Sequence, residues 1–181
     1  APDNDASTAA ANMRGKTVLV TGAGGSIGSA LCRHIAAGAP KALVMLDAAE
    51  TALFHIDEEL LHQAAATGAR IRLVPVLGSV IDEARLDAVL SSHAVDVIFH
   101  AAAYKHVPLV ELNFGEAIRN NVLGTDAVLR AAIRHGVGQF VLLSTDKAAA
   151  PVSIMGASKR LAELILQAMA ESGRTLAQLA G

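Results

Sequence analysis

The sequence contains no tryptophan and one tyrosine, and aromatic residues are 3% of its 181 positions. A core with so few rings must be built from Ala, Val, Leu and Ile, as in helices that cover both faces of a parallel sheet. Charged residues are also scarce, at 18% with a net charge of −2. That balance provides no basic surface for nucleic acid or anionic lipid. Hydrophobic residues make up 52%, which excludes a disordered chain.

The single cysteine, Cys32, cannot form an internal disulfide, so we expect a reducing compartment. No apolar run approaches the ~20 residues that span a bilayer. The first five residues have neither the basic nor the apolar region of an export signal. The seven histidines show no metal-ligand spacing with Cys or carboxylates, and we expect no metal. These absences favour a cytoplasmic protein without direct contact with membrane or nucleic acid.

Apolar runs alternate with helical patterns from Lys16 onwards. The expected strands cover residues 17–20, 42–46, 71–76, 95–99 and 140–143, and the expected helices cover 26–37, 50–66, 82–90, 115–134 and 153–171. Five strand–helix repeats predict an α/β fold, a doubly wound parallel sheet. Residues 1–14 lack any periodicity and read as a flexible lead-in, so residues 15–181 form one domain.

Pro75 lies within the third expected strand, which the order 3-2-1-4-5-6 places at the edge of the sheet, where proline is tolerated. Gly38 is expected to end the first helix as its C′ residue, and Asp82 to cap the third. Residues 174–181 show no recognisable sixth strand. We therefore expect the nucleotide-binding part of a longer enzyme, with its C-terminal substrate lobe absent.

A glycine-rich turn, Thr21-Gly22-Ala23-Gly24-Gly25-Ser26-Ile27-Gly28, follows the first strand and opens the first helix. In such a turn the first glycine permits the tight bend, the second lets the backbone approach a pyrophosphate, and the third lets helix and strand pack closely. A turn of this kind can also be merely structural, but the strand before it and the helix after it favour dinucleotide binding. The candidate residues are Gly22, Gly24, Gly25, Ser26, Ile27 and Gly28.

Asp47 ends the second strand, 19 residues after Gly28, where a carboxylate binds ribose hydroxyls. A carboxylate at this position repels a 2′-phosphate, and Ala48-Ala49-Glu50 supplies no cation to neutralise one. The sequence therefore favours NAD over NADP.

Two further segments follow strands four and five. His100-Ala101-Ala102-Ala103 places small residues at the carboxyl end of a central strand, where a cofactor needs room, although an ordinary Ala-rich exit would look the same. Ser144-Thr145-Asp146-Lys147 leaves strand five, and Met155 and Lys159 lie one helical turn apart on the same side of the next helix. By charge alone these are surface residues. Their place at the carboxyl edge favours function.

The stretches 21–28, 100–111, 119–125 and 144–159 together resemble the extended short-chain dehydrogenase/reductase superfamily, which has the NAD(P)-binding Rossmann fold. More narrowly, they resemble bacterial nucleotide-sugar 4,6-dehydratases of polysaccharide biosynthesis, the UDP-N-acetylglucosamine type, from about residue 14 to 170. The resemblance implies a lyase that uses NAD to convert a UDP-N-acetylhexosamine into a 4-keto-6-deoxy product. It also implies a homo-oligomer as one arrangement, because helices 115–134 and 153–171 form dimer contacts in many relatives.

The resemblance implies specific roles for four residues. Thr145 would hydrogen-bond the C4 hydroxyl of the sugar, and Lys159 would hold the nicotinamide ribose. Asp146 would be the general acid for the departing C6 hydroxyl, and Lys147 the base at C5. Asn120 and the following Asn121 match a family Asn pair whose role is either site orientation or helix packing.

Two positions depart from the family pattern. Met155 replaces the usual tyrosine, which leaves the base for the C4 proton open between Asp146, Lys147 and a water molecule. Gly78-Ser79-Val80 stands where relatives often have Gly-Asp, so Ser79 and Val80 are candidate contacts for adenine. The open alternatives are a nucleotide-sugar 4-epimerase, which relies on that tyrosine, and a non-catalytic NAD-binding module.

Overall fold

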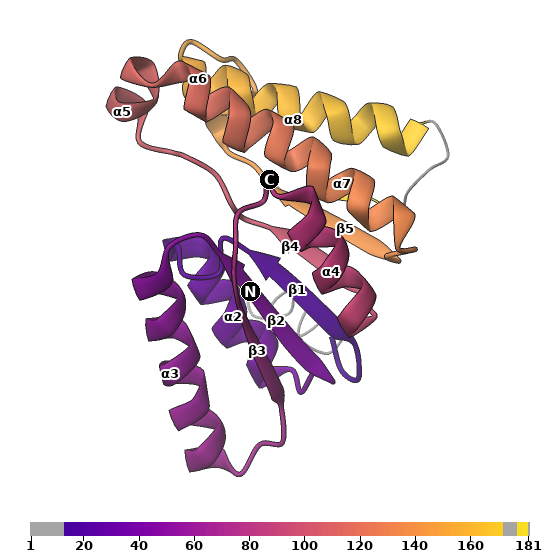
Figure 1. Cartoon of the computed structure of the whole chain (residues 1–181). Coiled ribbons are helices and arrows are strands. Elements are labelled where there is room, and N and C mark those ends of the chain that lie inside the picture. The colour runs from indigo at the N-terminus through magenta and orange to yellow at the C-terminus, as the bar shows by residue number, and fades with distance from the viewer. Residues whose placement is uncertain (1–12, 172–176, 181) are drawn as a thin grey trace, which may run out of the picture.

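The computed structural model describes residues 13–171 and 177–180, and these form a parallel sheet in the order β3-β2-β1-β4-β5-β6 (Figure 1). The strands are β1 (Thr17–Thr21), β2 (Ala42–Asp47), β3 (Arg72–Leu77), β4 (Val97–His100), β5 (Gln139–Leu143) and β6 (Ala177–Ala180). Every neighbouring pair is parallel. The strand order confirms the doubly wound fold, and Pro75 lies in the edge strand β3, as expected.

Helices cover both faces of this sheet (Figure 1). They are α2 (Ser26–Ala37), α3 (Glu50–Thr67), α4 (Glu83–His93), α5 (Val107–Leu112), α6 (Phe114–Ala117), α7 (Gly124–Arg134) and α8 (Ile154–Glu171). Alternate residues of β1 point to opposite faces. Val18 and Val20 pack with α2 and α3, whereas Leu19 packs in the cluster of α4, α7 and α8. Both faces are buried, which explains the continuous apolar strands.

The structure differs from the expectations at both chain ends: a sixth strand is present, and the expected flexible lead-in is only partly described. Ala177–Ala180 pairs parallel with β5, with Phe140 opposite Ala177, so a sixth strand exists where none was expected. Its Ala-rich sequence has low strand propensity, and pairing with the free edge of β5 supplies the order. Most of the expected lead-in lies outside the described residues, but Met13 is buried at 4% exposure in the core of α2 and α3.

The helix expected over 115–134 is less regular than its pattern suggested. It begins as α6, continues as π-helix over η1 (Ile118–Leu123), and ends as α7. A separate helix, α5, precedes it and was not expected; the two are divided at Asn113, whose φ and ψ are −132° and 46°. A π-helical turn inserts an extra residue, and such turns often mark functional sites.

The cap expected for α4 is confirmed, whereas the end of α2 differs from the expectation. Asp82 caps α4 by accepting a hydrogen bond from the Arg85 amide at 3.0 Å. Gly38 does not take the expected left-handed conformation, because its φ is −78°; Ala39 takes it instead, at 53°. Leu53, Ile56 and Leu60 form the buried stripe of α3.

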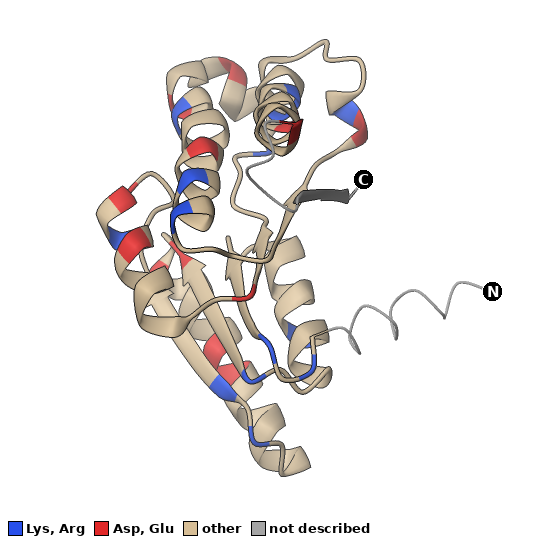
Figure 2. Cartoon of the chain, turned by 90° about the vertical axis from the view of Figure 1, so that its right-hand side faces the viewer, with Lys and Arg blue, Asp and Glu red and all other residues tan. Residues whose placement is uncertain are grey.

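The surface carries charges of both signs. Lys and Arg alternate with Asp and Glu along the helices rather than gathering on one face (Figure 2). Many are paired, as in Arg134–Asp87 at 3.0 Å and Arg130–Asp126 at 2.7 Å. Within the described part of the chain, no helix is long and apolar enough to cross a bilayer.

Candidate cofactor and catalytic site

The glycine-rich turn between β1 and α2 is held by close backbone contacts. Gly22 has a φ of +67°, and a Cβ on it would lie 2.7 Å from the Ala102 backbone. A Cβ on Gly28 would lie 1.9 Å from the Gly22 carbonyl oxygen. A Cβ on Gly25 would approach only that same oxygen, at 3.3 Å. The glycines therefore do what the motif predicts for them: a tight turn, an open approach and close helix–strand packing.

The N-terminus of α2 opens onto this turn. Its N-cap, Gly25, supplies no side-chain hydrogen bond, and the first turn contains no acidic residue. The first amides of a helix have no partner within the helix and carry the positive end of its dipole. The arrangement is therefore suited to an anionic group such as a pyrophosphate.

Asp47 fastens the end of β2 to the same turn. Its Oδ2 accepts a hydrogen bond from the Gly24 amide at 2.8 Å, and its Oδ1 accepts one from the Ala49 amide at 2.8 Å. The carboxylate borders a pocket of about 250 Å³ that lies along the carboxyl edge of β1, β2 and β4. None of the described residues that line this pocket is Lys or Arg.

Most of the expected cofactor-binding residues meet in that pocket or the one beside it. The first is lined by Gly22, Gly24, Gly25, Asp47, Ser79, Val80, Ala101, Ala102 and Ala103, among others. The second, of about 500 Å³, is lined by Gly22, Gly25, Ser26, Ile27, Gly28, Ala101, Ala103 and Lys159, among others. The shared residues show that the pockets adjoin.

The larger pocket also brings the candidate catalytic residues to the cofactor side. Thr145 and Lys147 line it from η2 (Asp146–Ala148) and the residue before it, and Lys159 lines it from α8. Met155 forms an apolar part of the wall and is only 4% exposed, packed with Val110 and Ala117. It offers no group that exchanges a proton.

Lys159 is a buried cation at the end of β5. Its residue exposure is 7%, and its Nζ donates a hydrogen bond to the Leu143 carbonyl oxygen at 2.5 Å. Burial lowers the pKa of this ammonium group from 10.5 to about 8, and the nearby Glu163 partly opposes that shift. The lysine is therefore near its titration point at the alkaline end of the physiological range.

Asp146 does not line the pocket. Its side chain is 88% exposed, and its Oδ1 accepts hydrogen bonds from Thr145 Oγ1 at 2.9 Å and from the Lys147 amide at 2.9 Å. The Thr145 hydrogen bond and the Lys147 charge hold the pKa of this carboxyl below its ordinary value. In this arrangement Asp146 is an ionised acceptor on the rim of the pocket.

A family comparison adds to this geometry. The family model described as "Polysaccharide biosynthesis protein" matches residues 18–179. The chain belongs to that family.

Curated relatives support this membership. The chain is 44% identical over 159 residues to the capsular polysaccharide biosynthesis protein CapD of Staphylococcus aureus, covering 88% of the chain and 26% of CapD. It is 42% identical to the probable polysaccharide biosynthesis protein EpsC of Bacillus subtilis, covering 94% of the chain and 28% of EpsC. A UDP-glucose 4-epimerase of Rickettsia canadensis is 40% identical, with 86% and 44% covered. The chain thus spans about a quarter of CapD and EpsC.

Solved structures share the fold. The dTDP-glucose 4,6-dehydratase DesIV of Streptomyces venezuelae, solved with NAD bound, has a TM-score of 0.75 and 28% identity over 90% of this chain and 54% of its own. Pen from Bacillus thuringiensis has a TM-score of 0.79 and 28% identity over 92% of this chain and 49% of its own. This member of the polysaccharide biosynthesis family therefore has the NAD-binding fold of the short-chain dehydrogenase/reductase superfamily, as expected.

Sequence reasoning missed a buried network between β1, β4 and α7. His100 is fully buried; its Nδ1 lies 2.7 Å from Thr21 Oγ1 and its Nε2 lies 3.0 Å from Thr125 Oγ1. Thr125 donates its hydroxyl proton to the Asn121 carbonyl oxygen at 2.7 Å, so we infer that Nε2 of His100 carries the proton. Burial lowers the pKa of His100 to about 3, so it stays neutral.

Two more residues lie at the site: Lys105, which was not expected there, and Asn121, for which site orientation and helix packing were both open. Lys105 Nζ donates to Ser26 Oγ at 3.3 Å and lines the larger pocket. Asn121, buried in η1, donates to the Tyr104 carbonyl oxygen and to Ser158 Oγ, both at 3.0 Å. It thereby ties the loop after β4 to the residue before Lys159. The signals were present in the His100–His106 string and in the Asn pair, but neither indicates a partner.

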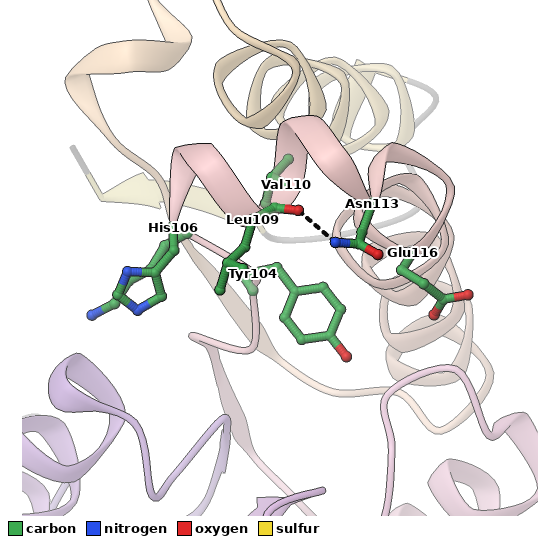
Figure 3. A pocket seen from close by; sticks show the side chains of 8 residues that line it. Tyr104, His106, Leu109, Val110, Asn113 and Glu116 are labelled. Carbon is green, nitrogen blue, oxygen red and sulfur yellow. Dashed lines mark hydrogen bonds between the residues drawn. The ribbon is translucent and has the colours of Figure 1, made fainter.

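A third pocket, of about 380 Å³, lies beside the larger pocket and shares Ala103, Tyr104, Lys105 and His106 with it. Figure 3 shows the Tyr104 ring on the same side as Asn113 and Glu116, under the turn between α5 and α6. The Asn113 side chain is fixed by a hydrogen bond to the Leu109 carbonyl oxygen at 2.9 Å. This pocket extends the site away from the glycine-rich turn.

Proposed function

We propose that this chain is the NAD-binding domain of a nucleotide-sugar 4,6-dehydratase that acts on a UDP-N-acetylhexosamine in polysaccharide biosynthesis. The observation that carries the proposal is the pocket of about 500 Å³ that joins the glycine-rich turn to Thr145, Lys147 and Lys159. Relatives named for polysaccharide biosynthesis, and a dehydratase of the same fold solved with NAD, support it.

The residues present fit NAD. Gly25 and the uncapped amides of α2 suit the pyrophosphate, and Lys105 lies beside Ser26, where its charge adds to the attraction. Asp47 retains acceptor capacity for ribose hydroxyls, and its charge opposes a 2′-phosphate. No cation among the described lining residues of its pocket would offset that repulsion, which favours NAD over NADP.

Bound NAD would accept a hydride from C4 of the sugar and later return it to C6. We assign Thr145 Oγ1 to the C4 hydroxyl and Lys159 to the nicotinamide ribose. Lys159 stays charged below a pKa of about 8, so its ammonium group also stabilises the negative charge that develops on the C4 oxygen. The base that takes the C4 proton is left to Asp146, Lys147 or a water molecule, because Met155 takes up no proton.

The elimination step needs a base at C5 and an acid at C6. We assign Lys147 to remove the C5 proton and Asp146 to protonate the departing C6 hydroxyl, so that water leaves. Asp146 is ionised and exposed in this structure, so its role as an acid requires that its side chain rotate into the pocket. Release from Thr145 Oγ1 and burial under substrate both raise the pKa of a carboxyl, so Asp146 would take up a proton from solvent and then donate it to the departing C6 hydroxyl.

The experiment uses the full-length protein with NAD and a UDP-N-acetylhexosamine, with product analysis by NMR. The expected product is a 4-keto-6-deoxy sugar nucleotide. Combining Asp146→Asn with Lys147→Ala should lower turnover at least ~100-fold, while the affinity for NAD stays near that of the unsubstituted protein. Unchanged turnover in the doubly substituted protein would refute the role assignment.

A 4-epimerase is the second candidate, because relatives named UDP-glucose 4-epimerase are up to 40% identical. Buried Met155 weighs against it, since the resemblance places the epimerase tyrosine there. The same NMR assay separates the two: an epimerase product keeps its C6 hydroxyl. A non-catalytic NAD-binding module is the third candidate, and it predicts NAD binding without turnover by the full-length protein. We place the reaction in the cytoplasm.

A further inference from the structure

The end of β5 is fastened to α8 at two adjacent points. Lys159 Nζ donates to the Leu143 carbonyl oxygen at 2.5 Å, and Ser144 Oγ donates to Glu163 Oε1. Lys159 and Glu163 are one helical turn apart and face the same side of α8. The chain that leaves β5 runs directly from this double attachment into Thr145, so the attachment sets where Thr145 begins.

Glu163 acts through other residues rather than on a ligand. Its side chain is 13% exposed, and its Oε2 accepts a hydrogen bond from Arg160 at 2.9 Å. It does not line the catalytic pocket, whereas Ser144 and Lys159 do. One carboxylate oxygen is bonded to Ser144 at the exit of β5 and the other to Arg160 on α8, so the position of the side chain is fixed from two elements.

The charges around Lys159 show what Glu163 adds. Lys105 and Lys147 line the same pocket. His100, from β4, is neutral, and Asp146 is 88% exposed and does not line the pocket. Arg160 donates a hydrogen bond to Glu163 Oε2.

Glu163 is the acidic residue one helical turn from Lys159 on the same helix. Burial lowers the pKa of Lys159, and the Glu163 charge raises it. Without that charge, the ammonium group would lose its proton at a lower pH.

We propose that Glu163 is a positioning residue of the catalytic pocket: it anchors Ser144 at the exit of β5 and keeps the Lys159 ammonium group charged. The two effects are separable, because one depends on the hydrogen bond to Ser144 and the other on the negative charge. The inference rests on the proposed function only for its activity measurement.

The first test measures the titration of Lys159 without turnover. The chain has five lysines, so ¹³Cε signals of labelled lysine can be followed by NMR from pH 6 to 11, with Lys159→Met identifying the signal. Glu163→Gln keeps an oxygen for Ser144 but removes the charge, and the midpoint of Lys159 should fall by about one pH unit. Ser144→Ala keeps the charge and should leave the midpoint unchanged. Glu171→Gln, an exposed change at the end of α8, is the matched control and should also leave it unchanged.

The second test measures turnover of the full-length protein against pH. In Glu163→Gln the alkaline fall of kcat should move to lower pH by about the same unit relative to the unsubstituted protein. Ser144→Ala should lower kcat about tenfold at every pH, because Thr145 is less well placed, with little change in KM.

An unshifted Lys159 midpoint in Glu163→Gln would overturn the electrostatic half of the inference. An unchanged kcat in Ser144→Ala would overturn the anchoring half. If Glu163→Gln does not fold, Ser144→Ala still tests the anchor, and Glu163→Asp, which keeps the charge but shortens the reach, should retain the midpoint near that of the unsubstituted protein. Absence of turnover in the unsubstituted protein would refute the proposed function and leave the NMR result standing.

Discussion

The larger pocket is bordered on one side by β1 and α2 and on the other by β5 and α8, and the two sides are built in different ways. On the β1–α2 side the contacts are between backbone atoms: Gly22 faces the Ala102 backbone, Gly28 faces the Gly22 carbonyl, and Asp47 is bonded to two amides. On the β5–α8 side the candidate catalytic groups are side chains, three of them in or next to the short turn η2, and Asp146 is 88% exposed. The first half is fixed before any ligand arrives, whereas the second can change its hydrogen bonds when one binds. We therefore expect substitutions in the glycine-rich turn to affect mainly stability, and substitutions of the exposed residues after β5 to affect mainly turnover.

The largest effect is expected for Gly28→Ala, a substitution in the glycine-rich turn. The added Cβ would lie 1.9 Å from the Gly22 carbonyl oxygen, so the helix must move away from the strand. Overpacking against backbone should cost at least about 3 kcal/mol of unfolding free energy, and NAD binding should be lost. Urea unfolding and calorimetry measure both effects.

The matched control for that change is Gly115→Ala, because a Cβ at Gly115 meets no atom within 4 Å and the residue lies within helix α6. It should leave stability equal or slightly higher. Equal stabilities of the two variants would show that the turn is not constrained as described.

The next largest effect concerns the buried cation of the catalytic half. The folded-state pKa of Lys159, about 8, lies below its ordinary 10.5, so folding disfavours the charged form. The penalty is complete below pH 8 and disappears as the pH rises to 10.5. Relative to Lys159→Met, the unsubstituted protein should gain on the order of 3 kcal/mol across that window. Urea midpoints of both proteins from pH 7 to 10.5 measure the difference, and parallel curves would contradict it.

A smaller effect is expected for Asp47→Asn, which sharpens the comparison on the cofactor side. Asparagine keeps one acceptor oxygen but loses the charge that binds ribose and repels a 2′-phosphate. The Kd for NAD should rise about tenfold, and the preference for NAD over NADP should shrink. Calorimetry with both nucleotides measures this, with Glu171→Gln as the control. An unaltered preference would place the discrimination elsewhere.

The smallest effect on stability is expected for Asp146→Asn. The side chain is exposed and bonded only to its neighbours Thr145 and Lys147, so the unfolding midpoint should not change measurably. Turnover of the full-length protein should nevertheless fall. A large loss of stability would mean that the catalytic half is as tightly built as the glycine-rich half.

Much of the fold could be predicted from the sequence, because strands and helices are encoded by neighbouring residues. The strand order was confirmed, including the edge position of Pro75. The missed elements were β6 and α5. Neither has a strong local signal: β6 forms by pairing with β5, and α5 has six residues.

The candidate site was predictable only as a list of positions. The glycine spacing indicated the geometry of the turn, because each glycine acts on the backbone beside it. The sequence could not show that Asp47 bonds the Gly24 amide, that Asp146 is exposed, or that Glu163 bonds Ser144. Such contacts depend on which side chains meet across elements, and the hydrogen bond between His100 and Thr21 joins residues 79 positions apart.

The amino-acid sequence by itself determined the alternating elements, the glycine-rich turn and the carboxylate at the end of β2, because periodicity, turn chemistry and spacing act over short stretches of chain. Only the tertiary structure decided that Lys159 is buried, that His100 is neutral, and that Thr145 and Lys147 share a pocket with the turn. Burial and charge are properties of a packed environment, and packing brings together residues that the sequence keeps far apart.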